Sequence, residues 1–110
     1  MLAGRITPQK FVELTSTNPA KTYGLHPRKG SIAIGSDADL VIWDEKDITL
    51  DNAMLHHAVD YTPYAGMRLK AWPGVTLSRG EVVWDGAFHG RAGRGAFLAC
   101  GAPTLLPRRR

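Results

Sequence analysis

Apolar residues recur at helical spacing near the start of the chain, and this pattern predicts two short helices. Thr7-Pro8 and Asn18-Pro19 each place a capping residue before a proline, which needs no N–H at the first helical position. The apolar positions between residues 11 and 15 form one face of the first helix, and Gly24 is a suitable left-handed stop for the second. Both helices are shorter than the about 12–15 residues at which an isolated helix becomes marginal, so they must pack on other structure.

From residue 31 the apolar pattern becomes that of strands. Ser31–Ile34 alternates with period two, and Leu40–Trp43 is a continuous apolar run, typical of a strand that is covered on both faces. Ile48–Leu50 predicts a weaker strand. Met67–Ala71 predicts another, which we expect the sequence Trp72-Pro73-Gly74 to interrupt.

A tight hairpin is predicted around Arg79-Gly80. Val75–Ser78 and Glu81–Trp84 flank this pair and are rich in strand-forming residues. Residues 51–67 are mostly irregular, with proline and glycine as turn signals. The whole pattern predicts an α+β fold, in which two short helices precede a mostly antiparallel β unit of about five or six strands.

Length and composition allow one small domain. The chain has 110 residues, of which 44% are hydrophobic and 22% charged, so wholesale disorder is not expected. No apolar run reaches the about 18–20 residues of a membrane helix, and Met1–Arg5 lacks the apolar stretch of a secretory signal. The single cysteine, Cys100, excludes an internal disulfide and a multi-cysteine metal site. We therefore expect a cytoplasmic protein.

Positive charge is concentrated at the end of the chain. The net charge is +4, yet residues 1–89 carry nine basic and ten acidic side chains, whereas residues 90–110 carry five arginines and no acid. Nucleic-acid-binding domains usually spread basic residues over a folded face, so a nucleic-acid partner is not expected. Glycine, alanine and proline accompany these arginines, and we expect weak order beyond about residue 98.

The histidines offer no recognisable metal-binding spacing. His26, His56, His57 and His89 include no His-x-His or His-Glu-x-x-His arrangement. On a strand, His56 and His57 would point to opposite faces and could not chelate one ion. A single ligand contributed beside Asp60 is the alternative, but a loop pair that contacts backbone is the more ordinary interpretation.

The acidic residues have two interpretations. Asp37, Asp39 and Asp44 could supply paired carboxylates for general acid–base chemistry. Aspartates beside a glycine and before an apolar strand more often form turns, because their side chains accept hydrogen bonds from nearby N–H groups. We favour the turn interpretation.

The remaining reactive or aromatic residues also have ordinary explanations. Cys100 has no neighbouring histidine in sequence and is expected to be a free thiol. The spacing of glycines in residues 90–95 differs from that of a phosphate-binding loop. The three tryptophans could stack on a ligand, although packing is their usual role; they are Trp43, Trp72 and Trp84. Residue chemistry alone therefore indicates no catalytic site.

The order of residues along the chain, by contrast, closely resembles the late segment of D-hydantoinases and dihydropyrimidinases. The Gly-Ser-Asp-Ala-Asp stretch at residues 35–39 is shared by many amidohydrolases, and its combination with Asn-Pro-Ala-Lys and His-His-Ala-Val-Asp-Tyr is specific. The resemblance covers about residues 4–98. The shared stretches are residues 11–21, 24–25, 27–30, 35–44, 56–61, 64, 66–67 and 77–83.

This resemblance implies a hydrolase of cyclic amides such as hydantoins and dihydropyrimidines. Members of the family have a TIM barrel with a binuclear metal centre, usually zinc, and a β-sandwich built from both chain ends. Their metal ligands are histidines, a carboxylated lysine and an aspartate, all upstream of the matched segment. The resemblance therefore assigns no catalytic, cofactor-binding or metal-binding residue to this chain, and His56 and His57 match a position outside the metal centre.

The resemblance also divides the chain into three parts. Residues 1–25 correspond to the last barrel helices, residues 26–90 to the C-terminal share of the sandwich, and residues 91–110 to a basic, loosely ordered tail. We expect such a partial fold to be inactive alone, to leave a strand edge unpaired, and to associate with itself or with the missing barrel part. The sequence Trp72-Pro73-Gly74-Val75 departs from the family, with Gly74 at a position that is more often apolar.

A second function remains open. Collapsin response mediator proteins share the hydantoinase scaffold and act in protein assembly without catalysis. The sequences Trp43-Asp44 and Leu77-Ser78-Arg79-Gly80 are closer to those of the enzymes. A non-catalytic, hydantoinase-like assembly protein is therefore the alternative to the hydrolase.

Overall fold

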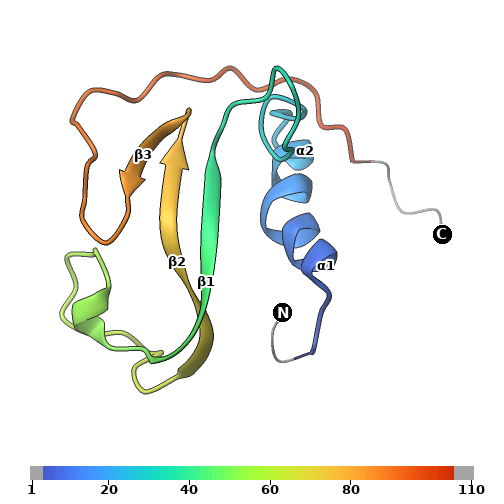
Figure 1. The fold of residues 1–110 in the computed structure, drawn as a ribbon. Helices are drawn as coiled ribbons and strands as arrows, with labels where there is room; N and C mark the ends of the chain where they lie inside the picture. Colours follow the sequence, from blue (N-terminus) through green and yellow to red (C-terminus); the bar gives the residue numbers. More distant parts are fainter. Residues whose placement is uncertain (1–3, 106–110) are drawn as a thin grey trace.

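The N-terminal helices join into one helical rod in the computed structural model, which describes residues 4–105. The rod consists of α1 (Pro8–Val12), a π-helical turn η1 (Glu13–Thr17) and α2 (Asn18–Thr22) (Figure 1). The cap at Thr7 is confirmed, since its Oγ1 accepts a hydrogen bond from the Lys10 N–H at 3.1 Å. The left-handed stop is also confirmed, because Gly24 has a φ of 65°.

The π-turn explains why the two predicted helices are continuous. Pro19 has no N–H to donate to the carbonyl four residues earlier, and its ring crowds that carbonyl. Widening the preceding turn from α to π accommodates the ring without ending the helix. The second cap-and-proline signal thus marks an irregularity inside one rod.

Within residues 4–105 one antiparallel sheet contains three strands in the order β1-β2-β3. They are β1 (Leu40–Thr49), β2 (Arg68–Ser78) and β3 (Glu81–Trp84) (Figure 1). The expected five or six strands are therefore too many. The strands predicted at Leu40–Trp43 and Ile48–Leu50 merge into β1, and those predicted at Met67–Ala71 and Val75–Ser78 merge into β2. Each pair merges because its two apolar runs belong to the same β1–β2 ladder.

The interruption predicted at Trp72-Pro73-Gly74 is wrong. Trp43 pairs with Pro73 and Ile42 pairs with Val75, so Gly74 is an extra residue that β2 absorbs as a bulge. A Cβ atom at Gly74 would overlap the carboxylate of Asp44. Glycine at this position therefore permits the bulge rather than weakening the strand.

The strand predicted at Ser31–Ile34 is also wrong. This segment forms bends and turns, and Ile32 and Ile34 are almost fully exposed. The hydroxyl of Ser31 donates to the carbonyl of Pro27 at 3.1 Å, which closes a local turn. In the described part of the chain this segment has no partner strand, so alternation alone does not produce a ladder.

The predicted hairpin is confirmed. Ser78 pairs with Glu81, which leaves Arg79 and Gly80 as the two-residue turn. Both have positive φ, 50° and 80°, as the turn that matches strand twist requires. Residues 51–67 are irregular as expected, apart from one 3-10 turn, η2 (Asn52–Met54).

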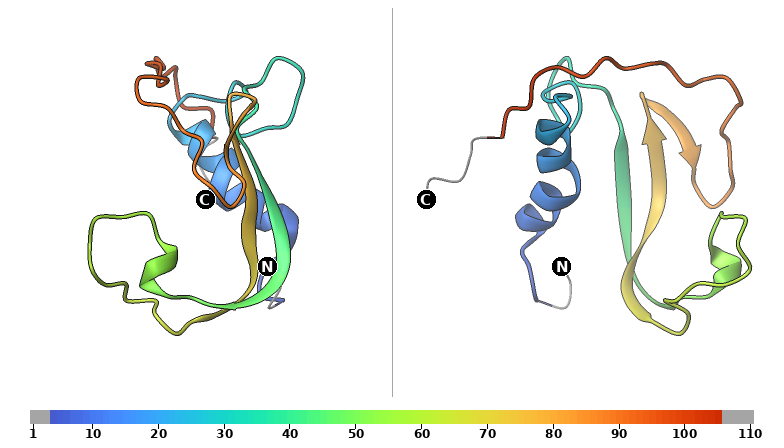
Figure 2. Two further views of the ribbon diagram at one scale, coloured as in Figure 1. Left: turned by 60° about the vertical axis from the view of Figure 1, so that its left-hand side comes forward. Right: turned by 180° about the vertical axis from the view of Figure 1, so that it is seen from behind.

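The helical rod stands beside β1, at the edge of the sheet (Figures 1 and 2). Among the described residues only two apolar side chains are buried, Ala20 and Leu50. Val41, Ile42 and Trp43 in β1 are 45%, 54% and 43% exposed, so this strand is not covered on both faces within the chain. The segment that follows β3 crosses back to the rod and is extended up to residue 105 (Figure 2).

Candidate functional site

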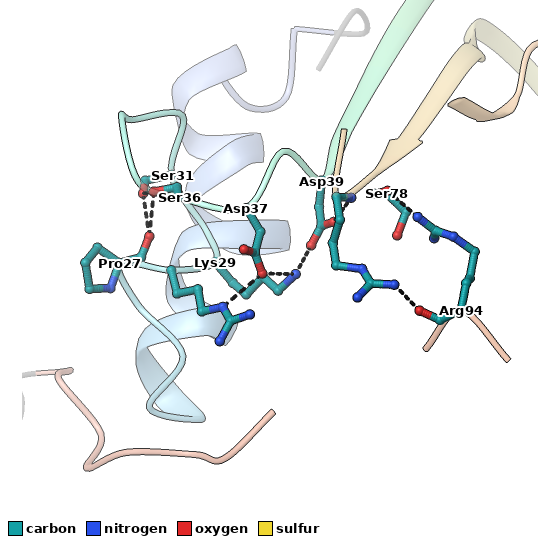
Figure 3. A network of polar contacts seen from close by, with 10 residues as sticks. Pro27, Lys29, Ser31, Ser36, Asp37, Asp39, Ser78 and Arg94 are labelled. Carbon is teal, nitrogen blue, oxygen red and sulfur yellow. Dashed lines mark hydrogen bonds and ion pairs between the residues drawn. The ribbon is translucent and has the colours of Figure 1, made fainter. Parts of the chain in front are cut away.

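The predicted acidic group lies at a junction between the helix–sheet loop and the hairpin (Figure 3). Lys29 Nζ lies 2.8 Å from Asp37 Oδ2 and also contacts Asp39, while Arg28 Nε lies 3.1 Å from Asp37. Asp39 Oδ1 accepts the backbone N–H of Arg79 at 2.8 Å, and the Gly80 N–H donates to the carbonyl of residue 38 at 2.9 Å. The junction thus ties the hairpin turn to the loop that follows the helical rod.

The contacts at this junction stabilise the ionised forms of Asp37, Asp39 and Lys29. Hydrogen bonds from Lys29 and then Arg28 lower the pKa of Asp37 below its usual 3.8. Partial burial raises the pKa of Asp39, but hydrogen bonds from Lys29 and the Arg79 backbone outweigh that effect and lower it overall. The same two carboxylates raise the pKa of Lys29.

The contacts differ from those of the turn interpretation, because Asp37 pairs with the side chains of Arg28 and Lys29 and Asp39 accepts the N–H of a residue forty positions away. A carboxylate that is neutralised by a lysine and has a lowered pKa is a poor general base near neutral pH. Asp44 does not join the group and lies beside Gly74 on the sheet. The junction is therefore built to hold segments together.

The histidines lie in separate places, and each has a local contact. The ring of His56 packs edge-on against Trp84 with centroids 4.6 Å apart, and His57 Nδ1 accepts the Val59 N–H at 3.3 Å. His89 Nε2 lies 2.7 Å from Asp85 Oδ1. The backbone N–H of His26 donates to the rod at 3.2 Å.

Neither histidine of the His56-His57 pair is on a strand, and their contacts fit the loop interpretation. Between residues 4 and 105 no three His, Cys, Asp or Glu side chains are grouped so that they could hold a metal ion. Asp60 is in the same irregular loop as the pair.

The tryptophans do not form a common stacking platform. Trp43 makes an edge contact with Phe11 of the rod, with ring centroids 5.8 Å apart, and Trp84 makes an edge contact with His56. Trp72 pairs with Asp44 across the sheet. Cys100 is an exposed free thiol.

A mainly apolar groove lies between the helical rod and β1, and the sequence pattern did not predict it. Its volume is about 730 Å³. Its lining includes Phe11 and Val12 from the rod, Val41 and Trp43 from β1, and Ile32 from the loop between them. Apolar positions on each element were visible in the sequence, but not that the rod and strand would leave a gap between them.

Comparison with known proteins identifies the family. The profile of the amidohydrolase family matches residues 1–83. The chain belongs to the amidohydrolase family. It is 45% identical to D-hydantoinase of Ralstonia pickettii over 97 residues and 48% identical to D-phenylhydantoinase of Escherichia coli over 100 residues. These alignments cover 86% and 89% of this chain, but only 21% and 22% of the relatives.

Solved structures show the same arrangement inside longer amidohydrolase chains. A D-hydantoinase crystal structure matches with a TM-score of 0.85 and 44% identity over 89% of this chain and 22% of its own. The dihydropyrimidinase of Brevibacillus agri matches with a TM-score of 0.88 and 38% identity over 96% of this chain and 23% of its own. This chain therefore spans about a fifth of the length of the relatives it matches.

Amidohydrolases are generally metal-dependent, and the described residues of this chain do not fit a metal centre. The residue types that could bind a metal are dispersed, and His56, His57 and His89 already contact other groups. No step of a metal-assisted reaction can therefore be assigned to these side chains. In the same residue range, no helix is long and apolar enough to cross a membrane.

Proposed function

We propose that this chain is the C-terminal portion of a D-hydantoinase/dihydropyrimidinase-type hydrolase that opens cyclic amides, and that it is inactive alone. The supporting observation is the match of nearly the whole fold to about a fifth of a D-hydantoinase structure, with a TM-score of 0.85 and 44% identity. In this proposal the reacting groups, and the zinc pair that the family implies, belong to the remaining four-fifths of such an enzyme.

The role of this portion is structural. Residues 1–25 provide the last helices of a barrel, residues 26–90 the C-terminal share of a β-sandwich, and residues 91–110 a basic tail. In support of this division, Val12 and Leu14 of the rod and Val41 and Ile42 of β1 are about half exposed, and the rod touches the sheet through Phe11 and Trp43. A rod and a sheet that each expose an apolar face are suited to pack against further layers.

The remainder of the enzyme is the proposed partner of the groove. The match covers 89% of this chain but only 22% of the longer one, so in this proposal the groove of this chain faces part of the remaining four-fifths. Protein interiors are close-packed, and a gap of this size between apolar faces is filled. Self-association through the same faces is expected when the remainder is absent.

The test is complementation in two steps. The isolated chain is first incubated with dihydrouracil or hydantoin and added zinc, beside full-length Ralstonia pickettii D-hydantoinase, and we expect turnover only with the full-length enzyme. The chain is then co-expressed with a form of that enzyme lacking its matching 97 residues, and we expect a complex with restored turnover.

The outcomes separate the candidate functions. Turnover by the isolated chain would overturn the proposed inactivity. A complex without turnover, formed by a truncated enzyme that its own 97-residue segment does reactivate, would favour the assembly protein over the hydrolase. Failure to form a complex in that same pairing would contradict the proposed partner of the groove.

A further inference from the structure

Residues 90–105 form an extended segment, here named the strap, which crosses from the end of β3 to the end of α2 (Figure 2). The strap has no regular secondary structure, and most of its residues are exposed. Such a segment would be free to leave the surface unless specific contacts held it. Its contacts are concentrated at two places, one on the hairpin and one on the helical rod.

At the hairpin, two arginines hold the strap reciprocally (Figure 3). The guanidinium of Arg94 donates to the carbonyl of Ser78 at 2.6 Å, and the guanidinium of Arg79 donates to the carbonyl of Arg94. Arg94 Nε also lies 3.4 Å from Glu81 Oε2. The Arg94 side chain is only 19% exposed, so its bond to the Ser78 carbonyl is partly shielded from water, whereas the bond from Arg79 is exposed.

At the rod, the strap donates hydrogen bonds to two carbonyl groups at and just beyond the end of α2. The N–H of Gly101 donates to the carbonyl of Gly24, and the N–H of Thr104 donates to the carbonyl of Lys21, both at 2.9 Å. A Cβ atom on Gly24 would overlap the carbonyl of Gly101. Glycine at position 24 therefore serves the helix stop and the approach of the strap together.

Few other contacts fix the rod against the sheet. The connecting loop joins them covalently, Lys29 links that loop to Asp39, and Phe11 touches Trp43 across the open groove. The strap adds a second connection between the two units, on the far side of the hairpin junction. A ring of contacts thus closes from rod to loop, hairpin, strap and back to the rod.

We propose that residues 90–105 are a strap clamped by Arg94, which holds the helical rod at a fixed distance from β1 and so keeps the groove open. Arg94 is a positioning residue in this proposal, because it touches neither the rod nor the groove. The proposal goes beyond the proposed function: it concerns contacts within this chain and stands whether or not the groove receives the rest of a hydrolase.

Arg91 offers a matched control. Its guanidinium also lies 3.4 Å from Glu81 Oε2, but its side chain is 75% exposed. Among residues 4–105, the Arg91 side chain bonds to Glu81 alone. Ion pairs on the surface contribute little, whereas shielded bonds from a charged donor to a carbonyl contribute more. Removing the Arg91 side chain should therefore leave the strap in place. Removing the Arg94 side chain should loosen it, because only the exposed bond from Arg79 to the residue-94 carbonyl then holds the strap at the hairpin.

The experiment measures amide hydrogen exchange by NMR in the full chain. In Arg94→Ala, we expect the amides of Gly101 and Thr104 to exchange about tenfold faster or more, because loss of one shielded bond loosens the far end of the strap. In Arg91→Ala we expect rates within about twofold of the unsubstituted chain. Strand β1 amides report whether each variant keeps its sheet.

A second readout uses the single cysteine. A spin label on exposed Cys100, beside the rod contact, should become more mobile in Arg94→Ala and not in Arg91→Ala. If Arg94→Ala does not fold, Arg94→Lys keeps the charge but loses the planar fork, and both readouts should change in the same direction. Unchanged exchange and label mobility in a folded Arg94 variant, or equal changes in Arg91→Ala, would overturn the proposal.

Discussion

The hairpin junction and the groove differ in how far this chain alone provides partners for their side chains. At the junction, Asp37 and Asp39 meet Lys29, and the turn N–H groups of Arg79 and Gly80 find acceptors within the chain. In the groove, which Asp37, Asp39 and Lys29 also line, apolar side chains of the rod and β1 face open space. Polar groups can be satisfied by one or two neighbours, but an apolar face must be covered by a whole layer.

This difference indicates what a segment of this length can organise alone. The junction needs only short loops and two strands, which residues 27–39 and 68–84 provide. The groove needs a third element between the rod and β1, and the described residues contain none. A chain that spans a fifth of its relatives can therefore have a finished polar junction and an unfinished apolar face.

The sharpest way to break the comparison is to place a charge in the groove. Val41→Lys should weaken self-association of the chain by about tenfold or more, because it removes apolar area from the contact surface. Sedimentation velocity over a concentration series measures the effect. The matched control is Ile34→Lys, a change at a fully exposed residue outside the groove. Equal effects of the two substitutions would contradict association through the groove.

A smaller effect is expected where the strap meets the rod. Gly24→Ala should lower the free energy of unfolding by about 1–3 kcal/mol, because a Cβ atom is strained at a φ of 65° and overlaps the Gly101 carbonyl. Urea unfolding followed by circular dichroism measures it. Gly95→Ala has open space for its Cβ and should stay within about 0.5 kcal/mol of the unsubstituted chain. An unchanged free energy of unfolding in Gly24→Ala would show that the strap and the rod are not in contact.

The smallest effect concerns pH at the junction. The pKa values of Asp37 and Asp39 are lowered from 3.8, so their contribution is present above about pH 3.8 and is lost as the pH falls below it. The pKa of Lys29 is raised from 10.5, so its contribution is present below about pH 10.5 and is lost as the pH rises above it.

Stability against urea should therefore decline at both ends of the pH range. Asp39→Asn should reduce both declines, with a cost near neutral pH of about 0.5 kcal/mol, since the side chain is partly exposed to solvent screening. Asp47→Asn is the control, because it removes only the exposed pair with Lys70. Identical pH profiles for Asp39→Asn and the unsubstituted chain would contradict a charged junction.

Local signals predicted the elements whose causes are local. The cap at Thr7, the stop at Gly24 and the turn at Arg79-Gly80 each depend on backbone geometry within four residues, and all three are confirmed. Ser31–Ile34 and the interruption at residues 72–74 were wrong for the opposite reason. Whether alternation becomes a strand, or a glycine becomes a bulge, depends on a partner strand many residues away.

The site shows the same limit. The sequence indicated that Asp37 and Asp39 would accept nearby N–H groups. The partners of Asp39 are instead Lys29 and the Arg79 N–H, which lie ten and forty residues away. The weak order expected beyond residue 98 did not anticipate the bonds of Gly101 and Thr104 to the rod. The last residues of the chain, 106–110, lie outside the described range.

The two anchors of the strap also set a rule for its length. Six residues separate Arg94 from Gly101, and deleting one shortens the reach of an extended chain by about 3.5 Å. Between these anchors, side chains such as Phe97 project into solvent, so their identity matters little. This part of the molecule should therefore accept many substitutions in evolution or design while tolerating almost no gain or loss of residues.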